Sequence, residues 1–479
     1  MSGKERTDHP HRGVVAISAP GGLTRRDLMQ RASALGLTAA FGGLGAGQLH
    51  AADFDPKKYA GTTISILMTG DENDHRALAD LASEFTAETG MELEITSPAL
   101  GALIETTLQN LTAERSSFDL INYLGYLTTQ QVGAGYYMRL NDYIDNPEET
   151  PPDWDFADFI PAAVRNVGIF DLESGTLGQG EDVYGVPALH SGSVIYFYRK
   201  DLFDAAGLQP AKTWDEFKAA AEKLHTDEVA GCSFIGANDF SLATVDWFAR
   251  FVTIGGQLTT GSAQEKNLTP QVSSPEAVQA LQMLIDVLPY APANVTQYGF
   301  AENVDGFATG KIAQMVFWST IAGPVLNPET SMVADVTATG PVPAGEGQTP
   351  RAIQGGWGLG IPANIDPERA DAAYRALTWI TSKRVDKHAA SEYQIDANRT
   401  STFSDPELLA KYPHFEHSLA AIETAETIST SLIPEFFQLN DIMNVEFNAA
   451  LLGAQDAQTA CDKVQAQWED VLRRAGHLA

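Results

Sequence analysis

The chain has 479 residues, which is more than one hydrophobic core supports, so two domains or lobes are expected. Its formal net charge is −31. Its 44% apolar content is that of a folded globular protein, and its acidity argues against nucleic acid or anionic lipid as a partner. No window of about 20 uninterrupted apolar residues occurs, so no membrane span is predicted.

The first fifty residues have the pattern of an export signal peptide. Arg25 and Arg26 precede a weakly apolar stretch, Ala32 to Gly47, that is rich in Ala and Gly. This arrangement is typical of twin-arginine signals, so we expect cleavage near 47–52 and release of a soluble product into the periplasm. Residues 1–52 contain six basic and three acidic residues, and the net charge without them would be −34.

Cys232 and Cys461 are the only cysteines in the sequence. An oxidising compartment would allow a disulfide between them. Nothing in the sequence shows that residues so far apart meet, so both outcomes stay open.

The mature chain begins with alternating strand and helix patterns. Thr62 to Met68 predicts a strand, and Asp74 is expected to cap the helix that follows. Met91–Ile95 and Phe118–Tyr123 predict two further strands, with a leucine-striped helix between them. Strand–helix–strand alternation indicates a parallel sheet covered by helices.

The stretch from Val183 to Leu208 is central to the predicted architecture. Val194 to Tyr198 is a continuous apolar run, which predicts a strand buried on both faces. A polar interruption that contains His190 and Ser191 precedes it. Because buried polar side chains need partners, we expect the chain to cross here from one lobe to the other beside a cleft.

The second half of the chain mixes strands and helices. Thr213 and Glu216 predict a capping box at the start of a helix. Strands are expected over Ser233–Ile235, Ile312–Trp318 and Ser331–Ala338, and the last ninety residues are mainly helical in pattern. The predicted fold class is α/β, with mixed sheets flanked by helices.

The sequence lacks the motifs of common enzyme classes. It has no His-Glu-x-x-His, Cys-x-x-Cys, Gly-x-Ser-x-Gly or phosphate-binding loop motif, and the glycines of Gly356–Gly360 lack dinucleotide-binding spacing. We therefore predict a protein that is not an enzyme and has no catalytic residue, metal or cofactor. A carboxylate pair formed in space, as in a glycan-acting enzyme, stays an open alternative.

Six predicted strand ends share one pattern, in which glycine or small polar residues adjoin aromatic residues or further polar ones. In open α/β sheets ligands bind beyond the carboxyl ends of strands, and pockets favour clefts between domains. Aromatic rings would stack on the C–H faces of a sugar, while polar groups bind its hydroxyls. Each residue alone could merely cap the core, but together they predict a carbohydrate site. The candidates are Asp71, Tyr123, Tyr126, His190, Ser191, Asn238, Asp239, Trp318, Ser319, Gly356 and Trp357.

Several short motifs between Gly61 and Leu472 occur together in one known family. They are Val183–Pro187 with Tyr196–Phe203, Thr213–Phe217, Phe307–Ala313 before Trp318, Gly355–Trp357 before Ile361, and Arg399–Ser401. They resemble the extracellular solute-binding proteins of ABC importers, in particular the carbohydrate-binding family that includes maltose-binding protein. Leu124 departs from that pattern, because a polar residue is frequent there, which affects Tyr123 and Tyr126.

The resemblance implies a two-lobed periplasmic-binding-protein fold of type II with the ligand cleft between the lobes. One lobe would hold 53–188 plus 332–383 and the other 189–331 plus 384–479. The resemblance adds Arg399 and, more loosely, Glu435 and Phe436 to the ligand-binding candidates. It implies a monomer that closes on its ligand by a hinge movement and delivers it to the permease subunits of an ABC transporter.

The ligand class stays open between a sugar and other small solutes such as a polyol, glycerol phosphate or a polyamine. A phosphate would need more basic residues than the predicted cleft offers, since Arg399 is its one strong candidate.

Overall fold

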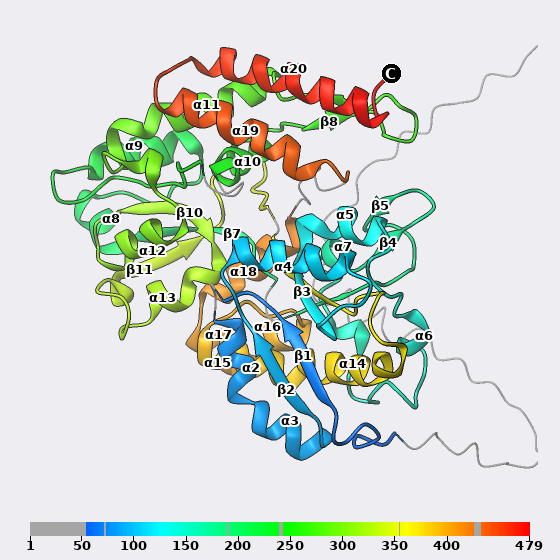
Figure 1. Ribbon diagram of the computed structural model, residues 1–479. Helices are drawn as coiled ribbons and strands as arrows, with labels where there is room; N and C mark the ends of the chain where they lie inside the picture. Colours follow the sequence, from blue (N-terminus) through cyan, green and yellow to red (C-terminus); the bar gives the residue numbers. More distant parts are fainter. Residues whose placement is uncertain (1–53, 71–72, 189–190, 239–242, 354, 426–432) are drawn as a thin grey trace, which may run out of the picture. The chain divides into compact units, whose positions relative to one another are not determined.

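A computed structural model describes residues 54–70, 73–188, 191–238, 243–353, 355–425 and 433–479 (Figure 1). Two β-sheets and the helices around them make up most of this part of the chain. None of its helices is both long and apolar enough to cross a membrane. The predicted export signal lies outside the described residues.

The first sheet has five strands of mixed direction. Their spatial order is β2 (Glu92–Thr96), β1 (Thr63–Leu67), β3 (Leu120–Leu124), β12 (Trp357–Gly360) and β6 (Val186–Pro187). β1 is parallel to β2 and β3, whereas β12 is antiparallel to β3 and β6. The strand–helix–strand pattern at the start of the chain therefore forms the parallel part of the sheet, as predicted.

Helices cover both faces of the first sheet, because its strands carry apolar residues on both sides. Ile64 and Ile66 of β1 lie in a buried cluster with Phe85 and Leu377, whereas Leu67 belongs to a cluster on the opposite face. The helices around this sheet are α2 (Asp74–Asp80), α3 (Ala82–Thr89), α4 (Leu100–Thr112), α5 (Thr128–Gly133), α6 (Asn141–Ile144), α7 (Pro161–Val167), α14 (Pro367–Ile380) and α15 (Lys383–Tyr393).

The second sheet has three antiparallel strands. They are β10 (Gln314–Trp318), β7 (Val194–Arg199) and β11 (Thr337–Gly340), with β7 in the middle. β7 is buried from Val194 to Tyr198, which confirms the prediction of a strand buried on both faces. Its residues join a hydrophobic cluster with Phe217, Trp247 and Trp468, which we call the second-lobe core.

Nine helices of the described chain contribute to the second-lobe core. They are α8 (Lys200–Ala206), α9 (Trp214–Leu224), α10 (Ala243–Thr253), α11 (Pro275–Val287), α12 (Phe300–Ala308), α13 (Ala322–Leu326), α18 (His414–Thr424), α19 (Phe436–Leu451) and α20 (Ala457–Ala475). The capping box predicted from Thr213 and Glu216 is present at the start of α9. Cys232 and Cys461 are free thiols buried in this core, so the structure contains no disulfide between them.

Ser233–Ile235 does not form the predicted strand. The Asn303 side chain donates to the Phe234 carbonyl at 3.2 Å, and the Asp246 carboxylate accepts from the Ile235 amide at 2.9 Å. Side chains thus occupy backbone groups that a neighbouring strand would use.

Two other predicted boundaries are also wrong. Ala334–Val336 forms a 3₁₀ turn (η6), and the strand expected from Ser331 begins at Thr337. The N-cap of α2 is Asn73 and not Asp74, which instead begins the helix.

The packing differs from the expected division into lobes in two segments. Residues from 332 were expected in the first lobe, yet β11 pairs with β7, and Ile353 packs in the second-lobe core. Residues from 384 were expected in the second lobe, yet Ala389 packs with Ala77 of α2, and Phe403 packs with Ala163 of α7. The segment from 332 therefore packs with the second sheet, and the segment from 384 begins by packing with helices of the first.

Two segments that connect the sheets run side by side. The chain passes from β6 to β7 through 188–193 and returns from β11 to β12 through 341–356. Backbone bonds join them, from Ala188 N to Trp357 O at 3.0 Å, Gly355 N to Gly192 O at 3.0 Å and Val194 N to Ile353 O at 3.3 Å. We call this pair the crossing ribbon.

The two ends of the described chain are held by different parts of the fold. Near the start, the guanidinium of Arg375 on α14 lies 3.9 Å from the ring of Phe54 and donates to the Asp55 carbonyl. At the other end, α20 packs in the second-lobe core and the Ala479 amide donates to the Lys266 carbonyl at 2.9 Å.

Candidate functional site

The end of β3 and the start of β12 meet at one edge of the first sheet. Trp357 pairs with Leu124, and the Gly125 amide donates to the Gly356 carbonyl at 3.0 Å. Tyr126 follows in a 3₁₀ turn, η1 (Gly125–Leu127). Gly356 has φ +91°, a conformation that favours glycine, so the turn into β12 depends on this residue type.

Trp318, the last residue of β10, meets the crossing ribbon from the second sheet. A Cβ atom placed on Gly355 would lie 2.9 Å from the Trp318 ring and 3.3 Å from the Tyr126 hydroxyl oxygen. Because Gly355 lacks that atom, both aromatic side chains can approach its backbone. Tyr126 and Trp318 come from different sheets, and both lie close to the backbone of Gly355.

Asn166 of α7 supports the same turn from behind. Its side-chain amide donates to the Gly355 carbonyl, and it lies 2.8 Å from the position of a Cβ on Gly125. Asn166 is buried, so this bond fixes the backbone of the glycine pair.

Ser191 is held by a buried hydrogen-bond chain. Its hydroxyl donates to the side-chain oxygen of Asn398 at 2.8 Å. The Asn398 backbone and side-chain amides donate to Asp386 at 2.9 and 3.3 Å. Burial raises the pKa of Asp386, opposed by these bonds. These hydrogen bonds connect the crossing ribbon to α15, which contains Asp386. Ser191 itself is only 1% exposed.

Ser319 makes a second link between the crossing ribbon and the segment before Asn398. Its amide donates to the Ser193 carbonyl at 2.7 Å, and its hydroxyl accepts from the Ser193 amide at 3.1 Å. The same hydroxyl also contacts the carboxylate of Asp396. Ser319 is fully buried, so its position is set by protein partners.

Phe436 lies against Tyr126. It is the first residue of α19, and the two ring centroids are 5.5 Å apart at an interplanar angle of 35°. Phe436 is 2% exposed and belongs to the second-lobe core, whereas Tyr126 is half-buried. Phe436, a candidate added by the family resemblance, therefore contacts the Tyr126 ring.

Two candidates have their polar groups engaged elsewhere. The Tyr123 hydroxyl donates to the Val167 carbonyl at 2.5 Å inside the first lobe, and burial raises its pKa. The Arg399 guanidinium donates to the carbonyls of Thr381 and Asp155 at 2.6 and 3.0 Å. Burial lowers its pKa, while Asp386 and Asp158 oppose that shift.

The other described candidates lie apart from Tyr126 and Trp318 or are buried in the core. Trp357 is 5% exposed in a first-lobe cluster. The Glu435 carboxylate lies 3.0 Å from the His477 ring, near the end of the chain. Asn238 is exposed. Asp71, His190 and Asp239 lie outside the described residues.

Sequence reasoning missed two residues of this site, Asn166 and Asn398. Asn398 adjoins the Arg399–Ser401 motif, and that motif drew attention to the arginine rather than to the amide beside it. Asn166 lies in an ordinary amphipathic helix, and no local pattern in the sequence marks it. Only the position of α7 against the glycine turn shows its role.

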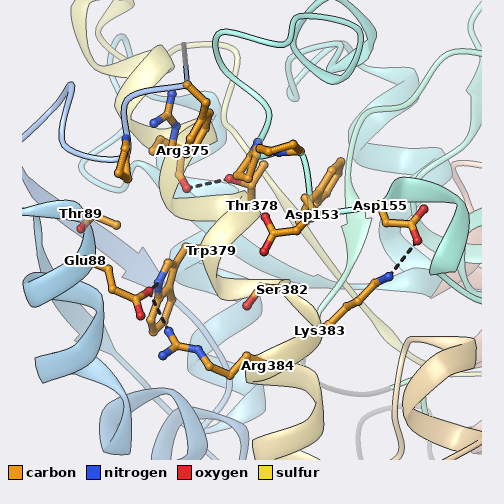
Figure 2. A pocket seen from close by; sticks show the side chains of 15 residues that line it. Glu88, Thr89, Asp153, Asp155, Arg375, Thr378, Trp379, Ser382, Lys383 and Arg384 are labelled. Atoms are coloured by element: carbon orange, nitrogen blue, oxygen red, sulfur yellow. Dashed lines mark hydrogen bonds and ion pairs between the residues drawn. The ribbon is translucent and has the colours of Figure 1, made fainter. Parts of the chain in front are cut away.

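A separate pocket lies between α14, α15 and the loop at 151–155 (Figure 2). Glu88 accepts from the Trp379 indole at 2.7 Å and from Arg384 at 3.0 Å. Lys383 pairs with Asp155 at 2.8 Å. These charged groups are already paired within the protein, and none of the described ligand-binding candidates lines the pocket, so we do not assign it as the site.

A search of the described residues finds no cluster of three or more His, Cys, Asp or Glu side chains that could hold a metal ion. The carboxylates of Asp386 and Asp396 are bonded to Asn398 and Ser319, and the groups around Gly355 are aromatic rings, glycine backbone and the Asn166 amide. Such groups favour a neutral ligand that combines C–H faces with hydroxyls.

The chain is similar to proteins that are named for the small solutes they bind. A family model described as bacterial extracellular solute-binding protein matches residues 69–387. A mannitol-binding protein of Pseudomonas aeruginosa is 26% identical over 395 residues, covering 77% of this chain and 86% of that protein. An sn-glycerol-3-phosphate-binding periplasmic protein of Agrobacterium fabrum is 25% identical over 309 residues, covering 60% of this chain and 66% of that protein.

Solved structures share the fold. An ABC transporter solute-binding protein of Agrobacterium radiobacter K84 in complex with ribitol has a TM-score of 0.76 and 25% identity, covering 86% of this chain and 99% of that one. Maltose-bound MalE3 of T. maritima has a TM-score of 0.75 and 21% identity, covering 86% and 100%. The predicted fold class is confirmed.

Proposed function

Since the chain belongs to the family of bacterial extracellular solute-binding proteins, we propose that it is the substrate-binding component of an ABC importer for a sugar or sugar alcohol. It would capture the ligand between its lobes and deliver it unchanged to permease subunits in the membrane. We propose no chemistry on the ligand and a monomer without a nucleic-acid partner.

One observation carries the proposal, the meeting of Tyr126 and Trp318 at Gly355 between the two sheets. Aromatic faces and bare backbone suit the C–H faces of a polyhydroxylated ligand, and pockets favour such junctions. The mannitol and ribitol ligands of the similar proteins have this chemistry. We place Ser191, Gly356 and Phe436 at the same site, together with the candidates outside the described residues, Asp71, His190 and Asp239.

A glycerol-phosphate ligand is the second candidate, because one relative binds sn-glycerol 3-phosphate. A phosphate needs cationic donors, and arginine is the usual choice. Among the site residues that the structure describes, Arg399 is the one cation, and its guanidinium already donates to Thr381 and Asp155. The described site therefore favours the neutral ligand.

Hinge closure would use the crossing ribbon. The lobes we propose differ from the sequence expectation, in that 332–353 joins the second lobe and 384–412 the first. The chain then crosses at 188–193 and at 354–356, where the crossing ribbon lies, and once more between 412 and 436. Ligand contacts with both lobes would shift the population toward the closed form.

We also propose export by the twin-arginine pathway, supported by Arg25 and Arg26 before the apolar stretch to Gly47. Replacing both arginines by lysine should retain the uncleaved protein in the cytoplasm. Unchanged periplasmic accumulation of the double-lysine variant would contradict this part.

Titration calorimetry tests the binding proposal with D-mannitol, ribitol, maltose and sn-glycerol 3-phosphate. We expect at least one of the first three to bind, and Trp318→Ala to weaken that binding by about 1–3 kcal/mol. Trp318→Phe keeps an aromatic face and should lose less. Thermal unfolding of each variant separates lost binding from lost folding. Binding of the phosphate ester alone would favour the second candidate, and unchanged affinity in Trp318→Ala would reject the site.

A further inference from the structure

The pair Tyr126 and Phe436 joins the two lobes directly. Tyr126 follows β3 of the first sheet, whereas Phe436 begins α19 and packs in the second-lobe core. Their ring centroids are 5.5 Å apart, within the range of aromatic contact.

This pair continues a wall that begins at Trp318. The Trp318 ring and the Tyr126 hydroxyl both lie against the backbone of Gly355, and the Tyr126 ring then meets Phe436. The four residues come from β10, the crossing ribbon, the end of β3 and α19. These contacts join the four residues in a continuous row from Trp318 to Phe436.

The spacing of the two rings excludes a sugar between them. A pyranose ring inserted between two aromatic faces needs an aliphatic contact of about 3.5–4 Å on each side, or roughly 7–8 Å in total. The observed centroid distance of 5.5 Å is shorter than that. An oligosaccharide could extend past this point only if the pair separated.

We infer that Tyr126 and Phe436 form a length stop, so that the site takes a monosaccharide or an open-chain sugar alcohol and excludes oligosaccharides. This inference rests on the proposed function and specifies the size of its ligand. Phe436 is 2% exposed and packs in the second-lobe core, so it is the rigid half of the stop.

The test compares short and long ligands in the wild type and in variants with smaller side chains. Calorimetry would measure ribitol, D-mannitol, maltose and maltotriose with the wild type, Tyr126→Ala, Phe436→Leu and the double variant. We expect the wild type to bind a sugar alcohol at least about tenfold more tightly than maltotriose. The double variant should lose most of this preference. Tyr126 is half-buried, so Tyr126→Ala is expected to fold. It tests the length stop even if the Phe436 variants do not fold.

Phe437→Ala is the matched control, since it removes a neighbouring ring that contacts Phe436 but is not paired with Tyr126. It should keep the wild-type preference for short ligands. A preference that persists in folded Tyr126 and Phe436 variants would overturn the length stop. Wild-type binding of maltotriose as tight as that of any shorter ligand would also overturn it, while the proposed function stands. A wild type that binds no sugar or sugar alcohol would reject the proposed function and the length stop with it.

Discussion

Replacing Arg250 by methionine removes the charge that faces Asp246 inside the second-lobe core. The side chains are 2% and 3% exposed, and Arg250 Nη1 lies 3.3 Å from Asp246 Oδ1. The guanidinium also lies 4.3 Å from the Trp214 ring centroid. Methionine keeps an unbranched apolar side chain of similar length, so the variant tests the charge more than the volume.

The expected cost follows from the geometry. Two unit charges 3.3 Å apart attract by about 5 kcal/mol at an effective dielectric constant of about 20. Removal of one partner of a buried ion pair typically costs about 3–5 kcal/mol, because the other group is left buried without its partner. We therefore expect the unfolding free energy of Arg250→Met to fall by about 3–5 kcal/mol at pH 7.

The cost should depend on pH through Asp246. Burial raises its pKa to about 6 even though Arg250 opposes the shift. A carboxyl whose pKa is higher in the folded state costs stability above that pKa, and the cost disappears below its unfolded pKa of about 3.9. Without Arg250 the folded pKa rises further. The deficit of the variant should therefore shrink as the pH falls from 7 to 5.

Urea denaturation at pH 7 and pH 5 measures both effects. Arg474→Met is the matched control, since Arg474 and Asp470 have the same i,i+4 spacing but side chains 65% and 66% exposed. Its cost should be at most about 0.5 kcal/mol. A loss in Arg250→Met as small as the control, or one that is equal at both pH values, would refute the reasoning.

Three further predictions concern stability and reactivity. Gly356→Ala forces a side chain into φ +91° and should lower the unfolding free energy by about 1–3 kcal/mol in denaturant titrations; an unchanged midpoint would contradict this. Burial raises the pKa of Cys232 and Cys461 to about 12, so a thiol reagent at pH 8 should label neither thiol in the native protein and both in urea; rapid native labelling would disprove it. Glu149→Ala leaves buried Arg375 without its carboxylate partner and should lower the free energy of unfolding by about 3 kcal/mol, measured by thermal unfolding. A decrease below about 1 kcal/mol would show that the carbonyl partners of Arg375 suffice.

Most elements of the fold could be predicted because their patterns are local. The apolar run of β7 and the capping box at Thr213 each depend on residues close in sequence, and both occur as predicted. Ser233–Ile235 has a strand-like composition, but the Phe234 carbonyl and the Ile235 amide bond to the side chains of Asn303 and Asp246, which are 69 and 11 residues away in sequence. Competition of that kind cannot be seen in a local pattern.

The candidate site could be predicted only in part for the same reason. The strand-end pattern marks Tyr126, Trp318 and Gly356, and the structure brings them together through Gly355. It does not say which way a side chain points, and the Tyr123 hydroxyl turns into the first lobe. Ligand contact by these residues stays a prediction that the binding experiments address.

The anchoring of the two chain ends has a practical consequence for sensing. The start of the described chain is clamped to α14 by Arg375, and its end is held beside α20. A donor fluorophore attached before Phe54 and an acceptor attached after Ala479 would thus be carried by different lobes, without any insertion into the fold. Energy transfer between them would report the proposed hinge closure in solution, and a ligand titration would become a ratiometric optical measurement.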